Sequence, residues 1–311
     1  MLDLIMIPLL IQLSPAPDEF FEQTYSEETS AAIAEREEGD ADGLTRTLER
    51  LGEAGDASAY EALGELHFNG LLGIEADPVR GCDYFAKVGV ARADALHNLA
   101  TCYYSGTGRE QDLTKARELY VKAAERGWRM SFCAYGNMLV RGEGGPVDAK
   151  EGIRLCRMTA ASGDADAQTD YGTYLLTGEG IDRDPVAARF ILEQAGAQGQ
   201  RNAAFLLGQI HTRGDGTPVD HRLAGEWFEK AYEWGRPDAA FDTARSYVRR
   251  GYSEREGEGI FVDPDLLRTA RSWLLKALKA EQPGSERYER VEKLIPSIER
   301  LIVSAEPTGT D

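Results

Sequence analysis

The chain has 311 residues, of which 42% are hydrophobic, so it is long and apolar enough to bury a substantial core. Its 53 acidic and 35 basic residues give a formal net charge of −18, a field that repels nucleic acid and anionic lipid. A nucleic-acid partner is therefore not expected. No stretch of 18 or more apolar residues provides an integral membrane span.

The chain begins with an apolar segment, MLDLIMIPLLIQLSPA, at residues 1–16. Residues 4–13 have the length of a signal-peptide core, and the small residues at 14–16 suit cleavage. No Lys or Arg precedes this core, however, and the segment contains Asp3. We predict a signal peptide and a periplasmic or secreted protein. The alternative is a cytoplasmic protein in which this segment is a strand or helix that packs on the body.

Residues 17–56 are expected to form helices that cap an array of repeats. Residues 18–38 are rich in acids, which would give a helix a solvated face. Residues 40–56, DADGLTRTLERLGEAGD, have the pattern of the second helix of a repeat and end with Gly55 at the expected place. A polar outer face on a terminal unit is what a solenoid needs to stay soluble.

Several rows of residues recur every 36 positions through the middle of the chain. The first glycine of a Gly-x-Gly loop recurs at Gly106, Gly142, Gly178 and Gly214. A row of aspartates keeps the same step at Asp112, Asp148, Asp184 and Asp220. Chance does not keep such rows in register, so the sequence predicts a repeat architecture.

Each repeat contains two helical patterns, one on either side of the Gly-x-Gly loop. Residues 94–106 have apolar side chains on one helical face, and residues 112–127 repeat that pattern. Asp112 is placed to cap the second helix, and Gly127 lies where a left-handed helix end needs glycine. In the first helix a small residue follows a large one and would let the neighbouring helix approach closely, at Gly64, Gly136, Gly172 and Gly208.

The Gly-x-Gly loop, GEG at residues 178–180, also suggests a phosphate site. The dinucleotide fingerprint needs a third glycine and a preceding strand, whereas Arg183 occupies that position and a helix precedes the loop. One or two carboxylates per loop are too few for calcium. We interpret the loop as a turn between helices whose glycines relieve backbone strain, and we expect no cofactor and no metal.

The two ends of the array depart from the period. In the first repeat the second glycine slips to Gly73, and in the sixth the loop GYSEREGEGIFVD holds ten extra residues. Residues 282–311 are expected to form a capping helix and tail. The helix spans 285–304 with a kink at Pro296, and residues 305–311 are a frayed tail.

Residues 95–127, ALHNLATCYYSGTGREQDLTKARELYVKAAERG, resemble the Sel-one-like repeat (SLR) family. The resemblance implies an all-α, right-handed α-solenoid of about six tetratricopeptide-like helix-turn-helix repeats. Their expected bounds are 57–92, 93–128, 129–164, 165–200, 201–236 and 237–281. It also implies an adaptor, assembly or signalling role without catalysis, in bacteria often at the envelope.

We interpret the chain as a non-enzymatic scaffold or adaptor that binds another protein or peptide. The rival interpretation is an enzyme, or an enzyme-activating component, that acts on cell-wall or polysaccharide material. Such an enzyme needs two carboxyls in contrasting environments, and the rows expected to face a groove contain only Glu61 and Glu65. His67 and His211 occupy packing positions and are expected in the core. The oligomeric state stays open.

If the tetratricopeptide comparison holds, the first helix of each repeat lines a concave groove. Two rows off its packing stripe would face that groove and bind a partner. The partner-binding residues that we predict in these rows are His97, Thr101, Asn137, Thr169, Thr173, Phe205, Gln209, Phe241 and Arg245. Phe205 and Phe241 are predicted to anchor a peptide as an apolar pair. The alternative is that each ring lies beneath the next repeat.

The four cysteines, Cys82, Cys102, Cys133 and Cys156, form no Cys-x-x-Cys pair. Distances from the connecting turns place Cys133 level with Cys156, and Cys82 level with Cys102, on facing helices. Cys82 falls in a row expected to be exposed, so its pair should not close. We predict free thiols, with a Cys133–Cys156 bridge as the alternative in an oxidising compartment.

Overall fold

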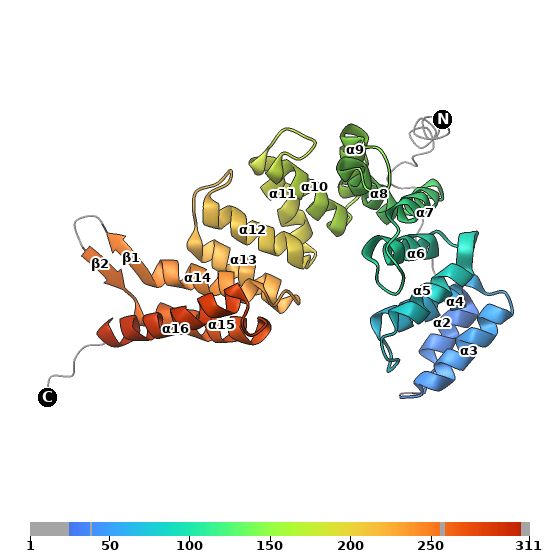
Figure 1. Cartoon of the computed structure of the whole chain (residues 1–311), viewed down its shortest axis with the longest axis horizontal. Helices are drawn as coiled ribbons and strands as arrows, with labels where there is room; N and C mark the ends of the chain where they lie inside the picture. Colours follow the sequence, from blue (N-terminus) through green and yellow to red (C-terminus); the bar gives the residue numbers. More distant parts are fainter. Residues whose placement is uncertain (1–24, 38, 256–258, 306–311) are drawn as a thin grey trace. The chain divides into compact units, whose positions relative to one another are not determined.

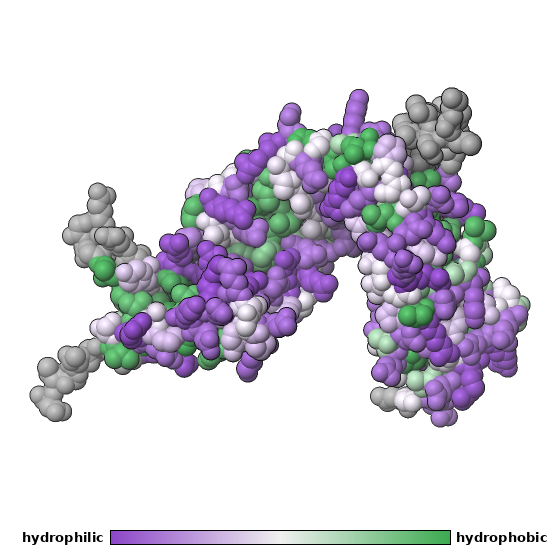
Figure 2. Space-filling view, viewed as in Figure 1, coloured by the Kyte–Doolittle hydropathy of each residue, from purple (hydrophilic) through white to green (hydrophobic). Residues whose placement is uncertain are grey.

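A computed structural model describes residues 25–37, 39–255 and 259–305 of the chain. The chain divides into two compact units, unit 1 (Met1–Ala167) and unit 2 (Gln168–Asp311). Each unit is built from successive helices joined by short loops, and its visible face is mostly hydrophilic (Figures 1 and 2). The predicted signal peptide lies outside the described residues.

Between residues 25 and 161, the described part of unit 1 has two capping helices followed by three helix pairs. The caps are α2 (Glu27–Ala34) and α3 (Ala41–Glu53). The pairs are α4 (Ala57–Asn69) with α5 (Pro78–Val88), α6 (Ala93–Ser105) with α7 (Leu113–Glu125), and α8 (Arg129–Arg141) with α9 (Ala149–Ala161). A short 3-10 turn, η2 (Gly89–Ala91), links α5 to α6.

Unit 2 continues the same alternation and ends on a long helix. Its helices are α10 (Ala165–Thr177), most of which belongs to this unit, α11 (Pro185–Ala197), α12 (Arg201–Arg213), α13 (His221–Glu233), α14 (Ala239–Gly251), α15 (Pro264–Ala280) and α16 (Glu286–Ala305). The insertion in the sixth repeat forms two antiparallel strands, β1 (Tyr252–Arg255) and β2 (Gly259–Val262). This hairpin is a local addition, and the predicted all-α solenoid of about six helix pairs is confirmed.

The predicted helix caps are present in both units. The Asp112 carboxylate accepts a hydrogen bond from the Lys115 N–H at 2.9 Å, and Asp220 accepts one from the Leu223 N–H at the same distance. Each carboxylate satisfies a backbone donor that the first turn of its helix leaves without a partner. Gly127 takes the predicted left-handed conformation with φ 82°.

Close approach in four of the described helix pairs involves the glycine that follows a large residue in the first helix, at Gly64, Gly136, Gly172 and Gly208. A Cβ on Gly64 would collide with the Phe85 ring, and one on Gly208 would lie 2.5 Å from the Phe228 ring. Both phenylalanines are almost fully buried. The missing side chain therefore lets the second helix approach closely, as predicted, and in these two pairs an aromatic ring of that helix occupies the space.

The Gly-x-Gly loop does more than turn the chain, because it also covers the preceding repeat. Gly108 lies against the backbone carbonyl of Pro78, and Gly144 against that of Leu113, so closely that a Cβ would collide. Both have positive φ, 74° and 67°. The second glycine of each loop thus allows one repeat to pack its backbone directly on the start of α5 or α7.

All four cysteines form disulfides, one between Cys82 and Cys102 and one between Cys133 and Cys156. The prediction of free thiols is wrong, and so is the expectation that Cys82 stays unpaired. The loop that contains Gly108 covers Cys82, which is fully buried. The corresponding face of the second helix is covered in the next repeat as well, where Arg117 of α7 donates a hydrogen bond to the Pro146 carbonyl at 3.1 Å.

Candidate functional site

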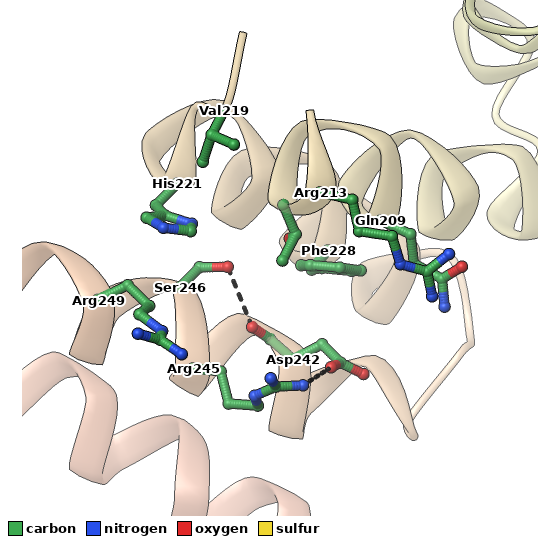
Figure 3. Close-up of a pocket in the computed structure, with 10 residues that line it drawn as sticks. Gln209, Arg213, Val219, His221, Phe228, Asp242, Arg245, Ser246 and Arg249 are labelled. Atoms are coloured by element: carbon green, nitrogen blue, oxygen red, sulfur yellow. Dashed lines mark hydrogen bonds and ion pairs between the residues drawn. The ribbon is translucent and has the colours of Figure 1, made fainter. Parts of the chain in front are cut away.

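Two consecutive repeats of unit 2 form a pocket of about 540 Å³ (Figure 3). Three helices and one loop contribute to its lining: Gln209, Thr212 and Arg213 from α12, Val219 from the loop, His221 and Phe228 from α13, and Asp242, Arg245, Ser246 and Arg249 from α14. Gln209 and Arg245 are one period apart, and so are Arg213 and Arg249. The same two positions of the first helix, one helical turn apart, therefore line the pocket in both repeats.

Positive charge dominates this pocket. Arg213, Arg245 and Arg249 bring three guanidinium groups, whereas Asp242 is the only carboxylate in the lining. Asp242 is already paired, at 3.3 Å with Arg245 and at 3.4 Å with Arg287. Burial raises the pKa of Asp242, against the opposing charge of Arg287. Within the described residues, no carboxylate pairs with the other two arginines, so the pocket is locally basic in a strongly acidic chain.

His221 adds a polar group without adding charge. Burial lowers the pKa of His221, and the nearby Arg249 lowers it further, so the imidazole is neutral at neutral pH. Its Nδ1 atom is buried and makes no hydrogen bond within the part of the chain that the structure describes. The pocket therefore offers one neutral imidazole beside its arginines.

Of the nine predicted partner-binding residues, two lie in this pocket, Gln209 and Arg245. Others are engaged by neighbouring side chains or backbone. His97 lies 2.9 Å from the Ser131 hydroxyl, Thr101 lies 2.9 Å from the Tyr120 hydroxyl, and Thr173 donates to the Thr169 carbonyl at 2.7 Å. Asn137 is half-buried in α8. Burial lowers the pKa of His97 to about 4, so this side chain is also neutral.

Phe205 and Phe241 are not open to a groove, so the expectation that their row is exposed is wrong for them. Phe205 is 9% exposed, packs on Phe228 with ring centroids 5.3 Å apart, and lies beneath the Arg236 guanidinium at 3.8 Å. Phe241 is 6% exposed and lies near Arg287. Thr169 of the same row is also buried. Phe205 is thus covered by Phe228 and Arg236 of its own repeat rather than by the next repeat, and the role of both rings in binding stays a prediction.

Sequence reasoning missed the two other arginines of the pocket. Arg213 and Arg249 lie four residues after Gln209 and Arg245, which places each one helical turn further along the same face. A third row through residues 69, 105, 141, 177, 213 and 249 would have identified them. His67 and His211, predicted as core histidines, are buried at 5% and 4% exposure.

A second pocket, in unit 1, gathers carboxylates rather than arginines. Glu65 and Asp94 contribute to its lining, with Tyr25 donating a hydrogen bond to Glu65. Burial, reinforced by the charges of Asp94 and Glu65, raises the pKa of Glu61 to about 8. Glu61 is fully buried and does not line this pocket, so the structure does not present it to a substrate as the rival polysaccharide-enzyme interpretation requires.

The structure offers no metal centre or membrane span in the residues it describes. Within 25–37, 39–255 and 259–305, no three His, Cys, Asp or Glu side chains are grouped to hold an ion. None of the helices in these ranges is long and apolar enough to cross a bilayer.

Paired helices stacked at a fixed period, with a pocket lined by the same positions of successive repeats, define a helical repeat protein. The chain belongs to the Sel1 repeat family, whose model matches residues 57–87, 93–128, 133–164, 165–200, 201–233 and 244–281. Sel1 repeat proteins generally mediate protein–protein interactions, and the family is generally non-catalytic.

Solved structures show the same fold. A Sel1 repeat protein from Oxalobacter formigenes aligns with a TM-score of 0.61 at 24% identity, over 84% of this chain and 99% of that chain. The protective antigen c5321 of uropathogenic Escherichia coli, which has an SLR fold, aligns with a TM-score of 0.56 at 23% identity. That alignment covers 89% of this chain and 60% of the antigen. At these identities the similarity establishes the fold alone.

Proposed function

We propose that this chain is a non-catalytic scaffold or adaptor that binds a partner protein on the surface around the unit 2 pocket. The observation that carries the proposal is the contrast between rows of the repeat. Packing positions keep small, buried residues, as at Gly208 and Ala244. The row that holds the exposed Arg213 and Arg249 changes residue type along the array, with Thr177 one repeat earlier. Residues that line a pocket and do not pack against the next repeat are suited to bind a partner protein.

We further propose that the protein acts outside the cytoplasm, in bacterial envelope assembly or signalling. Support comes from the two disulfides, because such bonds persist in oxidising compartments and are rare in the cytosol. The predicted signal peptide at residues 1–16 agrees with export. N-terminal sequencing of the protein isolated from its native cells tests this part. A mature chain that begins near residue 17 is expected, and an uncleaved chain recovered with reduced cysteines would contradict it.

Site-specific photo-crosslinking tests the binding surface. p-Benzoylphenylalanine replaces Gln209 or Thr212, both of which line the pocket without carrying its charge. Each variant, irradiated in native cells, should form a discrete adduct with one partner protein. The matched control replaces Phe190, a 59% exposed residue of α11 outside the pocket, and should give no such adduct. Equal labelling from Phe190, or no adduct at Gln209 and Thr212, would contradict the proposed surface.

A further inference from the structure

We infer that the unit 2 pocket binds an acidic peptide segment of its partner, with Arg213 and Arg249 as the groups that receive the carboxylates. This inference deepens the proposed function and rests on it, because it names the chemistry of the segment that the scaffold recognises.

The first argument is charge. The chain carries a net charge of −18, yet three guanidinium groups line one pocket with a single carboxylate among them. These arginines are exposed, so they give the pocket a local positive field that attracts an anion in an otherwise acidic chain. Asp242 serves Arg245 and Arg287, so the described residues leave the charge of Arg213 and Arg249 for an outside ligand.

The second argument is the type of donor. A guanidinium offers five N–H donors in a planar fork that fits a carboxylate with two parallel hydrogen bonds. The buried Nδ1 of His221 and the amide of Gln209 add neutral polar groups next to these forks. Such a set recognises the oxygens of Asp and Glu side chains better than it recognises an apolar helix.

The third argument is shape. A volume of about 540 Å³ is within the range of pockets that take several side chains, and is larger than a single ion needs. Gln209 with Arg213 and Arg245 with Arg249 form two similar rows on α12 and α14, so the donors are spread along the pocket. Val219, 54% exposed, supplies an apolar wall. These features fit an extended segment that carries acidic residues and an occasional aliphatic one.

The acidity of the rest of the chain favours a short anionic ligand over a long one. A long polyanion such as nucleic acid would extend beyond the three arginines into the field of the surrounding carboxylates. A short acidic peptide places its charges on the arginines alone. The structure therefore favours a peptide over an oligonucleotide of equal charge.

Fluorescence anisotropy on the full chain tests the inference. The probe is a fluorescein-labelled octapeptide with four glutamates and two leucines, and the control peptide has glutamine in place of each glutamate. The acidic probe should bind and should weaken as NaCl rises, because the contacts are ionic. The double variant Arg213→Gln with Arg249→Gln should weaken binding by about tenfold or more, since charge-assisted bonds are lost.

Matched variants separate local recognition from overall charge. Arg222→Gln with Arg290→Gln removes the same charge from exposed arginines that are paired with Glu226 and Glu286 outside the pocket, and should bind the probe like the wild type. Lysine in place of Arg213 and Arg249 keeps the charge but loses the fork, and should bind with intermediate affinity. Circular dichroism confirms that each variant keeps its helices.

Three results would overturn the inference: equal binding of the glutamine peptide, no loss in the Arg213/Arg249 variant, or tighter binding of a single-stranded oligonucleotide of equal charge. Failure of the acidic probe together with a partner adduct at Gln209 and Thr212 would reject the acidic chemistry and leave the scaffold function standing. Absence of that adduct would instead reject the scaffold function itself.

Discussion

The two units fill one position of the same repeat with different chemistry. Cys156 of unit 1 is bonded to Cys133, whereas the equivalent positions of unit 2, Leu192 and Phe228, hold apolar side chains. In each case the side chain lies where the neighbouring helix carries a glycine, as for Phe228 against Gly208. The same position of a helix pair is therefore filled by a covalent bond in unit 1 and by an apolar side chain in unit 2.

The units also differ in the charge of one row of the first helix, which runs from Glu65 in unit 1 to Arg245 in unit 2. In unit 1 the row that begins at Glu65 contributes to a pocket with Asp94, and in unit 2 the same row reaches Gln209 and Arg245. Packing rows keep their residue types because every repeat must fit the next one. The surface rows are free of that constraint, so a ligand-binding role can differ between units of one fold.

The largest expected difference between the units comes from the disulfides. Alanine at all four cysteines should lower the stability of unit 1 by about 6 kcal/mol, or about 3 kcal/mol for each bridge, because each bond closes a loop of roughly 20 residues. Hydrogen exchange resolved by peptide should show lost protection in unit 1 and little change in unit 2, which contains no cysteine.

Thiol counting on protein from native cells, denatured without reductant, checks the same point. No reactive thiol is expected, since all four cysteines are bonded. Four reactive thiols would restore the free-thiol prediction. If the alanine variant lost exchange protection equally in both units, the two units would unfold together. The disulfides would then not stabilise unit 1 separately from unit 2.

The next largest effect concerns Glu61, a buried ionisable side chain of unit 1. The equivalent position of unit 2 holds Phe205. Burial raises the pKa of Glu61 from 4.5 to about 8. The folded state therefore binds the extra proton, and the associated stability is lost as pH rises from about 4.5 to about 8. Glu61→Gln keeps an acceptor for Asn98, so it should raise stability at pH 8 by up to about 4 kcal/mol and have little effect near pH 4.5.

Thermal melts of the variant and the wild type at pH 4.5 and pH 8 provide the measurement. Glu49→Gln is the control with the opposite sign, because the hydrogen bond from Tyr84 lowers the pKa of Glu49 and favours its ionised form. That variant should lose stability at pH 8. A Glu61→Gln protein with the same gain at both pH values would show that Glu61 does not titrate with folding.

Sequence reasoning was reliable where the local backbone geometry accepts only one or a few residue types. Asp112 was identified as a helix cap because few side chains accept a backbone N–H there, and the aspartate row extends that cap to Asp220. Gly208 was identified because a neighbouring helix needs its space. The repeat period extended these local conclusions to the whole fold.

The errors concern contacts between different elements of the fold. Cys82 was counted as exposed because a helical period cannot reveal that the loop with Gly108 lies over it. Phe205 was placed in the groove because the period gives no sign of the ring of Phe228 or the guanidinium of Arg236. The site was found in part, since the row with Gln209 and Arg245 was recognised and the arginines one turn further were not.

Substitution of the loop glycines should lower the free energy of unfolding by amounts that differ less between the two units. Alanine at Gly144 would force positive φ and collide with the Leu113 carbonyl, at a cost of about 3 kcal/mol. Alanine at Gly216 would lie 2.9 Å from the Val186 nitrogen, which predicts about 2 kcal/mol. Gly163 has positive φ and open space, so its alanine variant should lose only about 1 kcal/mol. Urea unfolding measures all three, and an equal loss at each would mean that the approach between repeats is not tight.

The smallest effect should be the same in both units. Asp112→Ala and Asp220→Ala each remove a carboxylate that accepts a backbone N–H at the start of a helix, and each should cost about 1 kcal/mol. Asparagine at either position keeps the acceptor and should restore most of the loss. The comparison of the units rests on a shared helical framework, so their caps must respond alike in urea unfolding. If Asp220→Ala cost several times more than Asp112→Ala, the frameworks themselves would differ, and the disulfides and arginines would no longer be the features that distinguish the two units.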